Sequence, residues 1–208
     1  MKRNILRSIP AVLMLVFSGC TTIPPKDYTA FRQSKPRSIL VLPPINETTE
    51  VGASYSLLTT TTHPLCELGY YVMPVAVVDQ YMKENGLSVP AEMHQAPMAK
   101  LHEVFGADAV LYITVTQYGS KYQVFASNVV VAAKARLVDC RSGVTLWEGT
   151  AQAVNSGQSG LIEALVTQVL NKLMDQAHMV AAMASYQLLT TPTQGLLKGP
   201  RHLEYGKD

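Results

Sequence analysis

Three runs of alternating apolar and polar residues place the strongest constraint on the fold of this 208-residue chain. In residues 109–118, Ala109, Leu111, Ile113 and Val115 form one apolar face and Thr114 and Thr116 lie on the other, which is the period of a strand buried on one face. Residues 124–139 and 144–154 repeat the pattern, and Gly119-Ser120 and Arg141-Ser142-Gly143 are typical turn sequences between the runs. The pattern predicts an antiparallel meander of three strands.

The flanking segments predict strands and helices that complete a mixed sheet. Residues 38–44 and 70–74 are apolar runs that end at proline, as expected for buried strands. Helical spacing of apolar residues predicts helices over residues 54–68, 75–84 and 98–105, and a long last helix from an N-cap at Ser159 to about Ser185. We therefore predict a single α/β domain in which the helices, including the long C-terminal one, pack on a mixed sheet.

The last predicted helix has an unusually broad apolar surface. Its main stripe comprises Ile162, Val166, Val169, Leu173, Ala177, Val180 and Ala184, and Leu161, Leu165 and Met174 widen it. A surface of this width must pack on the sheet or on a second subunit. The sequence therefore also predicts self-association, most simply as a homodimer.

The N-terminus has the pattern of an export signal that ends at a cysteine. A basic start is followed by an apolar run over residues 9–17 and then by Ser18, Gly19 and Cys20. The run is about half the length that spans a bilayer. The pattern resembles the bacterial lipobox, with Phe17 where Leu is usual, and predicts acylation of Cys20 as the first mature residue. An ordinary signal peptide with an incidental cysteine is the weaker alternative, because residues 21–27 contain no A-x-A-like cleavage site.

These features divide the chain into four predicted parts. Residues 1–19 are the lipoprotein signal peptide, and residues 20–37 are the acylated cysteine with an extended tether that contains Pro24-Pro25. Residues 38–186 are the α/β domain, and residues 187–208 are an irregular tail laid on it. Thr21 and Thr22 follow the acylated cysteine, and by resemblance to lipoprotein sorting rules the lack of Asp there implies the outer membrane, on its periplasmic side.

The charge of the chain limits its possible binding partners, and its cysteines limit its possible disulfides. The chain has 17 basic and 15 acidic residues, and three of the basic ones belong to the signal, so the mature chain is nearly neutral. A near-neutral surface without a basic run argues against nucleic acid as a partner. An oxidising compartment would allow a disulfide between Cys66 and Cys140, but two separate buried thiols fit the sequence equally well.

No pattern in the sequence predicts catalysis or a bound metal. The five histidines form no HExxH motif, and no glycine-rich phosphate loop follows the first strand. Residues 157–160 superficially resemble a nucleophile elbow but lack its second glycine in the required place. Asp79, Glu84, Glu92 and Asp108 are predicted surface or cap residues. We therefore predict no catalytic residue, no metal, no cofactor and no enzymatic activity.

Two sets of segments resemble known lipoproteins. Residues 38–44 and 137–149 resemble the strand–turn–strand of a group that includes the curli-secretion lipoprotein CsgG and the penicillin-binding-protein activator LpoB, with a fold similar to the N-terminal domain of TolB. The lipobox, the Gly106-Ala107-Asp108-Ala109 junction and residues 199–206 resemble a family of bacterial lipoproteins of unknown function, whose members are often encoded beside CsgG-like proteins. These motifs are structural, so the resemblance implies a fold and an envelope role.

Three functional hypotheses follow from the sequence and the resemblance. The first is an accessory lipoprotein that assembles with a CsgG-like partner in envelope transport or secretion. The second is a regulator of a peptidoglycan synthase, which the LpoB likeness implies. The third, a periplasmic hydrolase, would require a clustered nucleophile and base that the sequence does not display.

Overall fold

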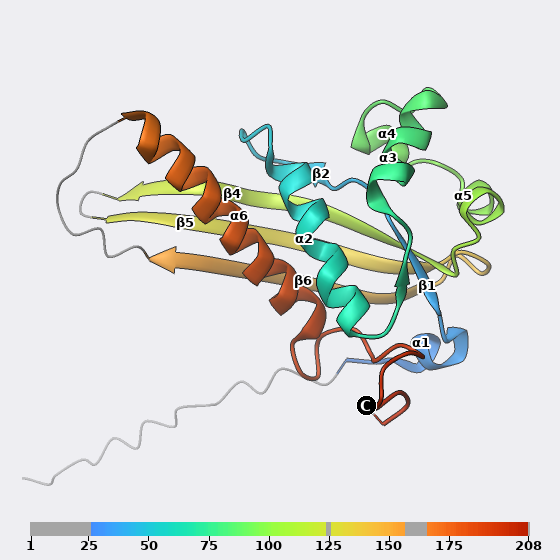
Figure 1. Cartoon of the computed structure of the whole chain (residues 1–208). Helices are drawn as coiled ribbons and strands as arrows, with labels where there is room; N and C mark the ends of the chain where they lie inside the picture. The colour runs from blue at the N-terminus through green and yellow to red at the C-terminus, as the bar shows by residue number, and fades with distance from the viewer. Residues whose placement is uncertain (1–25, 124–125, 157–165, 208) are drawn as a thin grey trace, which may run out of the picture.

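A mixed β-sheet runs through the domain and carries helices on both of its faces (Figure 1). The computed structural model describes residues 26–123, 126–156 and 166–207. Its strands are β1 (Ser38–Val41), β2 (Ile45–Asn46), β3 (Tyr71–Val72), β4 (Ala109–Gln123), β5 (Ala126–Asp139) and β6 (Thr145–Ser156). Its helices are α1 (Thr29–Ser34), α2 (Ala53–Glu67), α3 (Val75–Glu84), α4 (Pro90–Met93), α5 (Met98–Phe105) and α6 (Val166–Thr190).

The strands lie in the order β3-β1-β4-β5-β6, and β2 pairs with β4 beyond β1. The pairs β1–β3, β1–β4 and β2–β4 are parallel, whereas β4–β5 and β5–β6 are antiparallel. The predicted mixed sheet with an antiparallel meander is therefore confirmed. β6 is the outermost strand on the meander side among the described residues, so its outer edge pairs with no described strand.

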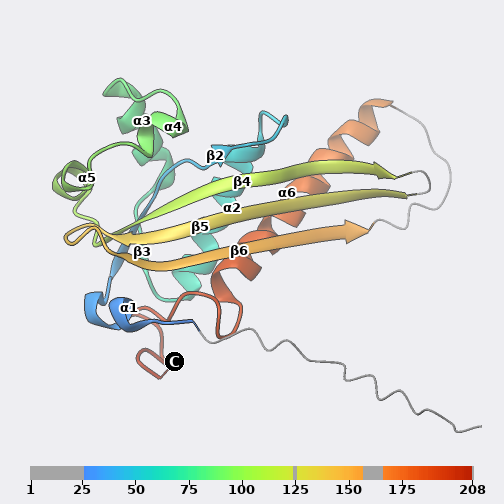
Figure 2. The same ribbon diagram turned by 180° about the vertical axis from the view of Figure 1, so that it is seen from behind.

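The two faces of the sheet are buried by different helices. α2 and α6 cover one face along the meander, and the first core cluster lies between them and residues such as Val41, Leu111 and Leu137 (Figure 2). α3, α4 and α5 gather at one end of the other face, where Leu40, Val110 and other residues form the second cluster. Alternate residues of β1 and β4 enter opposite clusters, because successive side chains of a strand point to opposite faces.

The last helix covers the sheet with the described part of its predicted stripe and ends five residues later than expected. Ala177, Val180 and Ala184 are buried, as is Leu188 in the extension to Thr190. The side chains of the stripe from Leu161 to Met174, and the predicted N-cap Ser159, lie outside the described residues. The described part of the surface that suggested a second subunit, Ala177, Val180 and Ala184, is thus buried within the domain itself.

The predicted turn at Gly119-Ser120 is wrong. Gly119 lies inside β4, opposite Val130 of β5, and the pairing continues to Gln123 opposite Ala126. Gly119 has a φ of +103°, which glycine adopts without the steric penalty of a Cβ atom. Glycine therefore allows an irregular backbone conformation within the strand, just beyond the register shift between Val115 and Gln117. Because the strand continues past Gly119, the meander is longer than predicted.

The predicted extended tether is also partly wrong. Within residues 20–37, α1 forms a short helix whose Phe31 is buried in the first cluster, together with the neighbouring Tyr28. The Tyr28 hydroxyl donates a hydrogen bond to the carbonyl oxygen of Gly195 in the tail. The domain therefore begins before residue 38. Burial of two aromatic side chains is favourable in free energy, and an extended tether would leave both exposed to water.

Candidate anchoring and interaction sites

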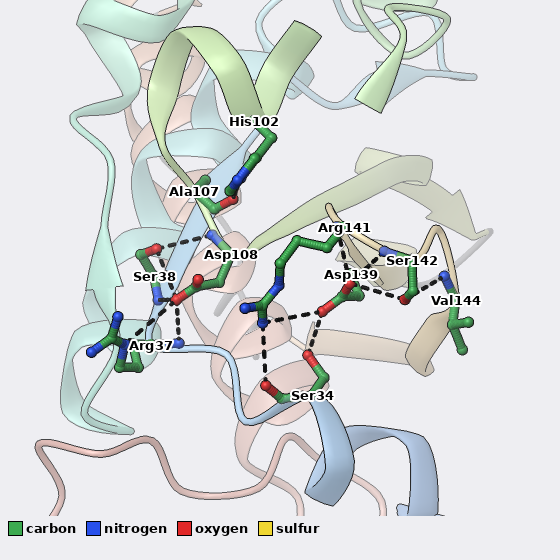
Figure 3. Close-up of polar contacts among 10 residues, drawn as sticks. All are labelled: Ser34, Arg37, Ser38, His102, Ala107, Asp108, Asp139, Arg141, Ser142 and Val144. Atoms are coloured by element: carbon green, nitrogen blue, oxygen red, sulfur yellow. Dashed lines mark hydrogen bonds and ion pairs between the residues drawn. The ribbon is translucent and has the colours of Figure 1, made fainter. Parts of the chain in front are cut away.

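Two aspartates at one end of the sheet bind the segment through which the chain enters the domain (Figure 3). Asp139 ends β5, and its Oδ2 accepts a 2.5 Å hydrogen bond from the hydroxyl of Ser34 at the end of α1. Its Oδ1 accepts from the backbone N–H groups of Arg141 and Ser142, at 3.0 and 2.8 Å, and from the Ser142 hydroxyl. The predicted turn 141–143 is therefore organised by the carboxylate that precedes it.

Asp108 makes the equivalent contacts at the start of β1. Its Oδ2 accepts hydrogen bonds from the backbone N–H groups of Arg37, at 2.9 Å, and Ser38, at 3.3 Å. The Arg37 side chain lies 3.9 Å from the same oxygen. Asp108 in turn donates its backbone N–H to the Ser38 hydroxyl, and its carbonyl oxygen accepts from the N–H of Cys140. We call Asp108, Asp139 and the residues that contact them the entry node.

The electrostatics of the entry node are those of a structural site. Burial by itself raises the pKa of Asp139, but the hydrogen bonds from Ser34, Ser142 and Arg141 outweigh it and hold the pKa below its ordinary value. A carboxylate that is ionised and already saturated with donors is a poor general base. Among the described residues, no group of three or more His, Cys, Asp or Glu side chains is arranged to hold a metal ion.

A second polar site lies on the sheet face that α3 to α5 leave partly open. The guanidinium of Arg136 lies over the ring of Tyr112, 4.7 Å from its centroid, and the ring of His94 meets Tyr112 edge-on. Burial lowers the pKa of His94, and the nearby charge of Arg136 lowers it further. The contact of His94 Nε2 with the carbonyl oxygen of Pro43, at 2.9 Å, raises the pKa but does not outweigh burial. His94, Tyr112 and Arg136 border a cavity of about 820 Å³ whose lining also includes Glu148, Gly149 and Thr150 of β6.

A serine and a histidine lie together at the contact of α2 and α6. Ser56 Oγ is 2.8 Å from His178 Nδ1 and accepts a hydrogen bond from the Tyr118 hydroxyl. The backbone N–H of Ser56 is bound within the helix, to the carbonyl oxygen of Gly52, so it cannot stabilise an oxyanion. This pair joins the two helices and lacks the donor arrangement of a hydrolase site.

The outer face of α6 exposes three large apolar side chains. Met179, Met183 and Tyr186 are 57%, 49% and 53% exposed, and their spacing places them along one side of the helix. We call these three residues the α6 stripe. It differs from the predicted stripe, whose described residues Ala177, Val180 and Ala184 face the core. Met side chains adapt to differently shaped partners, so this surface is suited to binding protein.

The predicted cysteine sites have different outcomes. Cys20 lies outside the described residues. Cys66 and Cys140 are both free: Cys66 is exposed near the end of α2, and Cys140 is buried in the second cluster, on the other face of the sheet. The structure therefore favours two separate thiols. Burial, with the charges of Asp139 and Asp108, raises the pKa of Cys140 to about 11, so its thiol is protonated at neutral pH.

Sequence reasoning missed most of the entry node. Asp108 was expected as a surface or cap residue, and its role in fixing β1 requires contact with residues 70 positions away. Asp139 lies within the strand–turn–strand segment 137–149, and the sequence Asp-x-x-Ser before Gly143 is the local signal that could have revealed its side-chain turn. No local sequence pattern indicates the hydrogen bond between Ser34 and Asp139, which are 105 positions apart.

The chain matches the family model described as "Putative lipoprotein GNA1162-like" over residues 26–201. It is 46% identical, over 97% of its length and 98% of the relative's, to "Putative lipoprotein NMB1124/NMB1162" of Neisseria meningitidis serogroup B. The crystal structure of lipoprotein GNA1162 from N. meningitidis matches with a TM-score of 0.56 and 45% identity, covering 68% of this chain and 97% of that one. These names designate lipoproteins and state no enzymatic activity.

A more distant structure has the same fold. The PelC dodecamer from Paraburkholderia phytofirmans matches with a TM-score of 0.51 at 18% identity, covering 78% of this chain and 90% of that one. Among the described residues of the present chain, no helix has both the length and the apolar character needed to cross a bilayer.

Proposed function

This chain belongs to the GNA1162-like lipoprotein family, and on that premise we propose that it is an outer-membrane lipoprotein that serves as an accessory component of an envelope export system with a CsgG-like partner. The family relationship supports a membrane-anchored envelope protein. The geometry supports a role through contacts, because the polar groups of the entry node and of the Ser56–His178 pair are engaged in holding the fold. The alternative of a periplasmic hydrolase has no support from these sites.

The single observation that carries the accessory role is the α6 stripe. Met179, Met183 and Tyr186 are about half exposed on a helix whose described residues on the opposite side, such as Val180 and Ala184, are buried, and the three lie outside the first core cluster. Burying three such side chains in a partner would supply several kcal/mol, at about 25 cal/mol per Å² of apolar surface. We assign this stripe to the CsgG-like lipoprotein partner.

Site-specific photo-crosslinking in intact cells tests this assignment. We expect a crosslinker at position 183 to capture a CsgG-like envelope protein, and one at Val104, which is similarly exposed on α5, to capture none. Met183→Glu should abolish the crosslink formed from position 179. Absence of any captured envelope protein at 179, 183 and 186 would contradict the proposal, and so would equal capture from Val104.

We propose that acyl chains on Cys20 hold the protein in the outer membrane. Two or three chains bury enough methylene groups, at about 0.8 kcal/mol each, for stable anchoring. Mass spectrometry of the purified protein should show a mature chain that begins at residue 20 and carries the mass of the acyl groups, and Cys20→Ser should lack that mass. Thr21→Asp should move the protein to inner-membrane fractions on a density gradient. An unmodified Cys20 would refute the anchor.

We also propose self-association as a homodimer through the outer edge of β6. An edge strand offers unpaired backbone N–H and C=O groups, which a second copy can pair across a two-fold axis. The solved PelC assembly, described as a dodecamer, shares the fold. Sedimentation of the Cys20→Ser chain at micromolar concentration should show a dimer. Val154→Lys on β6 should weaken it, and Val77→Lys on α3 should not; a monomer throughout would overturn the proposal.

A further inference from the structure

The lower end of the molecule in Figure 1 is built by two segments from opposite ends of the chain. α1 lies against the C-terminal tail, and Tyr28 and Tyr70 donate hydrogen bonds to the carbonyl oxygens of Gly195 and Leu197 in that tail. Together the two segments present seven basic residues, which we call the basal surface: Lys26, Arg32, Lys35, Arg37, Lys198, Arg201 and Lys207.

Positive charge is concentrated on this surface. Residues 26–37 and 195–208 contain those seven basic residues and three acidic ones, Asp27, Glu204 and Asp208. Residues 38–194 contain seven basic and twelve acidic residues. The positive excess of the nearly neutral mature chain therefore lies in these two segments, and it persists when Asp108, which pairs with Arg37, is counted with them. Such an uneven charge distribution orients a protein at a charged surface.

The basal surface also contains a cavity. A space of about 280 Å³ opens between α1 and the tail, and its lining includes the cationic side chains of Arg32, Lys35 and Lys198. Phe31, Tyr70 and Tyr205 supply aromatic walls. Guanidinium and ammonium groups around a partly apolar hollow suit a phosphate group that is attached to a larger, less polar molecule.

The anchor residue is close in sequence to this end of the domain. Lys26 follows Cys20 by six residues, and a chain of that length spans at most about 20 Å when fully extended. Lys26 itself is fixed to the domain, since its ammonium donates to the carbonyl oxygen of Glu148 and lies 5.2 Å from the centre of the Trp147 ring. A chain acylated at Cys20 must therefore hold the basal surface near the bilayer.

An exposed apolar side chain lies on the same end. Leu203 is 97% exposed, in a turn of the tail between Arg201 and Lys207. Fully exposed leucine between cationic residues is typical of surfaces that insert a side chain at the boundary between headgroups and acyl chains.

We propose that the basal surface docks on the phosphate headgroups of the anionic membrane leaflet that holds the Cys20 anchor. The proposal rests on the anchoring proposed above, because the short tether determines which surface the domain meets. Docking fixes the orientation of the domain: the basal surface faces the lipid, and the α6 stripe and the β6 edge lie to the side, where a neighbouring protein can reach them.

Vesicle binding by the mature Cys20→Ser chain tests the docking without the acyl groups. We expect it to sediment with vesicles of phosphatidylcholine and phosphatidylglycerol at low salt, and not with pure phosphatidylcholine vesicles. Each basic residue near an anionic surface contributes about fivefold in affinity, so Lys35→Glu with Lys207→Glu should weaken binding by tenfold or more. Leu203→Ser should weaken it severalfold and leave its salt dependence unchanged.

A matched charge reversal controls for net charge. Lys100→Glu with Lys134→Glu changes the charge equally, but these lysines lie on α5 and β5, and binding should stay within about twofold. Circular dichroism should confirm that all variants fold, and Lys35→Gln with Lys207→Gln provides a milder pair. Inorganic phosphate should compete no better than chloride at equal ionic strength; stronger competition would identify a free-phosphate site and overturn lipid docking.

Equal loss of binding in the two double variants would also overturn the proposal, as would equal binding to both kinds of vesicle. Failure of the anchoring proposal is measured separately, from the mass of the wild-type protein. If the wild-type protein is acylated but its Cys20→Ser form does not bind anionic vesicles, the docking proposal is refuted and the anchoring proposal stands.

Discussion

At the scale of single residues, two carboxylates accept hydrogen bonds from groups far away in the sequence. Asp139 fixes a backbone turn, and both Asp139 and Asp108 hold the segment that leads into β1. Hydrogen bonds to charged groups contribute about 1.5–3 kcal/mol, and the partly buried donors lose their partner when the carboxylate is removed. Acidic residues at these two positions therefore serve stability.

We expect Asp139→Ala to lower the free energy of unfolding by about 3 kcal/mol, because it leaves the donors of Ser34, Arg141 and Ser142 without their acceptor. Urea unfolding measures the change. The control, Glu103→Ala, removes an exposed carboxylate paired with Lys100 and should change the value by less than about 1 kcal/mol. Similar values for the two variants would contradict a structural role for the node.

The same carboxylate predicts a pH dependence. The native pKa of Asp139 lies below that of the unfolded chain, which is about 4, so the unfolded state binds the proton first as the pH falls. The stabilisation is complete above about pH 4 and is lost as the pH falls through the native pKa. Below about pH 4 the wild type should therefore lose more stability than Asp139→Ala as the pH falls; parallel curves would exclude this origin.

The two domain cysteines should differ in reactivity. Cys66 is exposed, whereas Cys140 is buried and has its pKa raised to about 11. A thiol reagent at about pH 8 should modify one domain thiol in the native protein and none in Cys66→Ser, since the thiolate is the reactive form. Unfolding should expose the second thiol. A disulfide in the purified protein would contradict the separation of the two residues.

At the scale of elements, the tail after α6 belongs to the domain because it packs against the end of α2. The N–H of Gly199 donates to the carbonyl oxygen of Leu68, and the N–H of Arg201 donates to that of Gly69. Gly69 has a φ of +88°, and a Cβ atom there would lie 2.3 Å from the backbone nitrogen of His202. The turn after α2 therefore requires glycine both for its conformation and for the space it leaves to the tail.

Gly86 provides a matched control for this contact, because its φ of +87° is the same and nothing lies within 4 Å of its added Cβ atom. Gly86→Ala should cost about 1–2 kcal/mol from backbone strain alone. Gly69→Ala should cost clearly more and should speed hydrogen exchange at Gly199 and Arg201. Equal costs, with unchanged exchange in the tail, would show that the close approach is unimportant.

At the scale of the whole molecule, both core clusters share the strands β1 and β4, so the two faces of the sheet should unfold together. Trp147, the single tryptophan, is buried in the first cluster, and Met93 is buried in the second. We expect Met93→Ala to lower stability by about 2–5 kcal/mol and to shift the unfolding midpoint of Trp147 fluorescence as far as that of circular dichroism. A fluorescence midpoint that does not move would show that the clusters unfold independently.

Local periodicity determined much of this protein. The alternation in residues 109–118 and 144–154 and the helical spacing in residues 75–84 and 98–105 specify strands and helices directly, because burying one face requires a fixed repeat along the chain. The sheet class and the packed last helix followed from those elements. The family resemblance carried by residues 106–109 and 199–206 was confirmed as well.

Tertiary contacts decided what no local repeat encodes. Gly119 could end a strand or lie within one, and the pairing of β4 with β5 made it part of the strand. Ser34 and Asp139 are 105 positions apart in the sequence and form a hydrogen bond. This contact and the burial of Phe31 hold α1 on the domain, where the sequence had predicted an extended tether. The basal surface exists only because α1 and the tail meet in space, since charge that is unremarkable in each segment becomes concentrated when packing brings the two together.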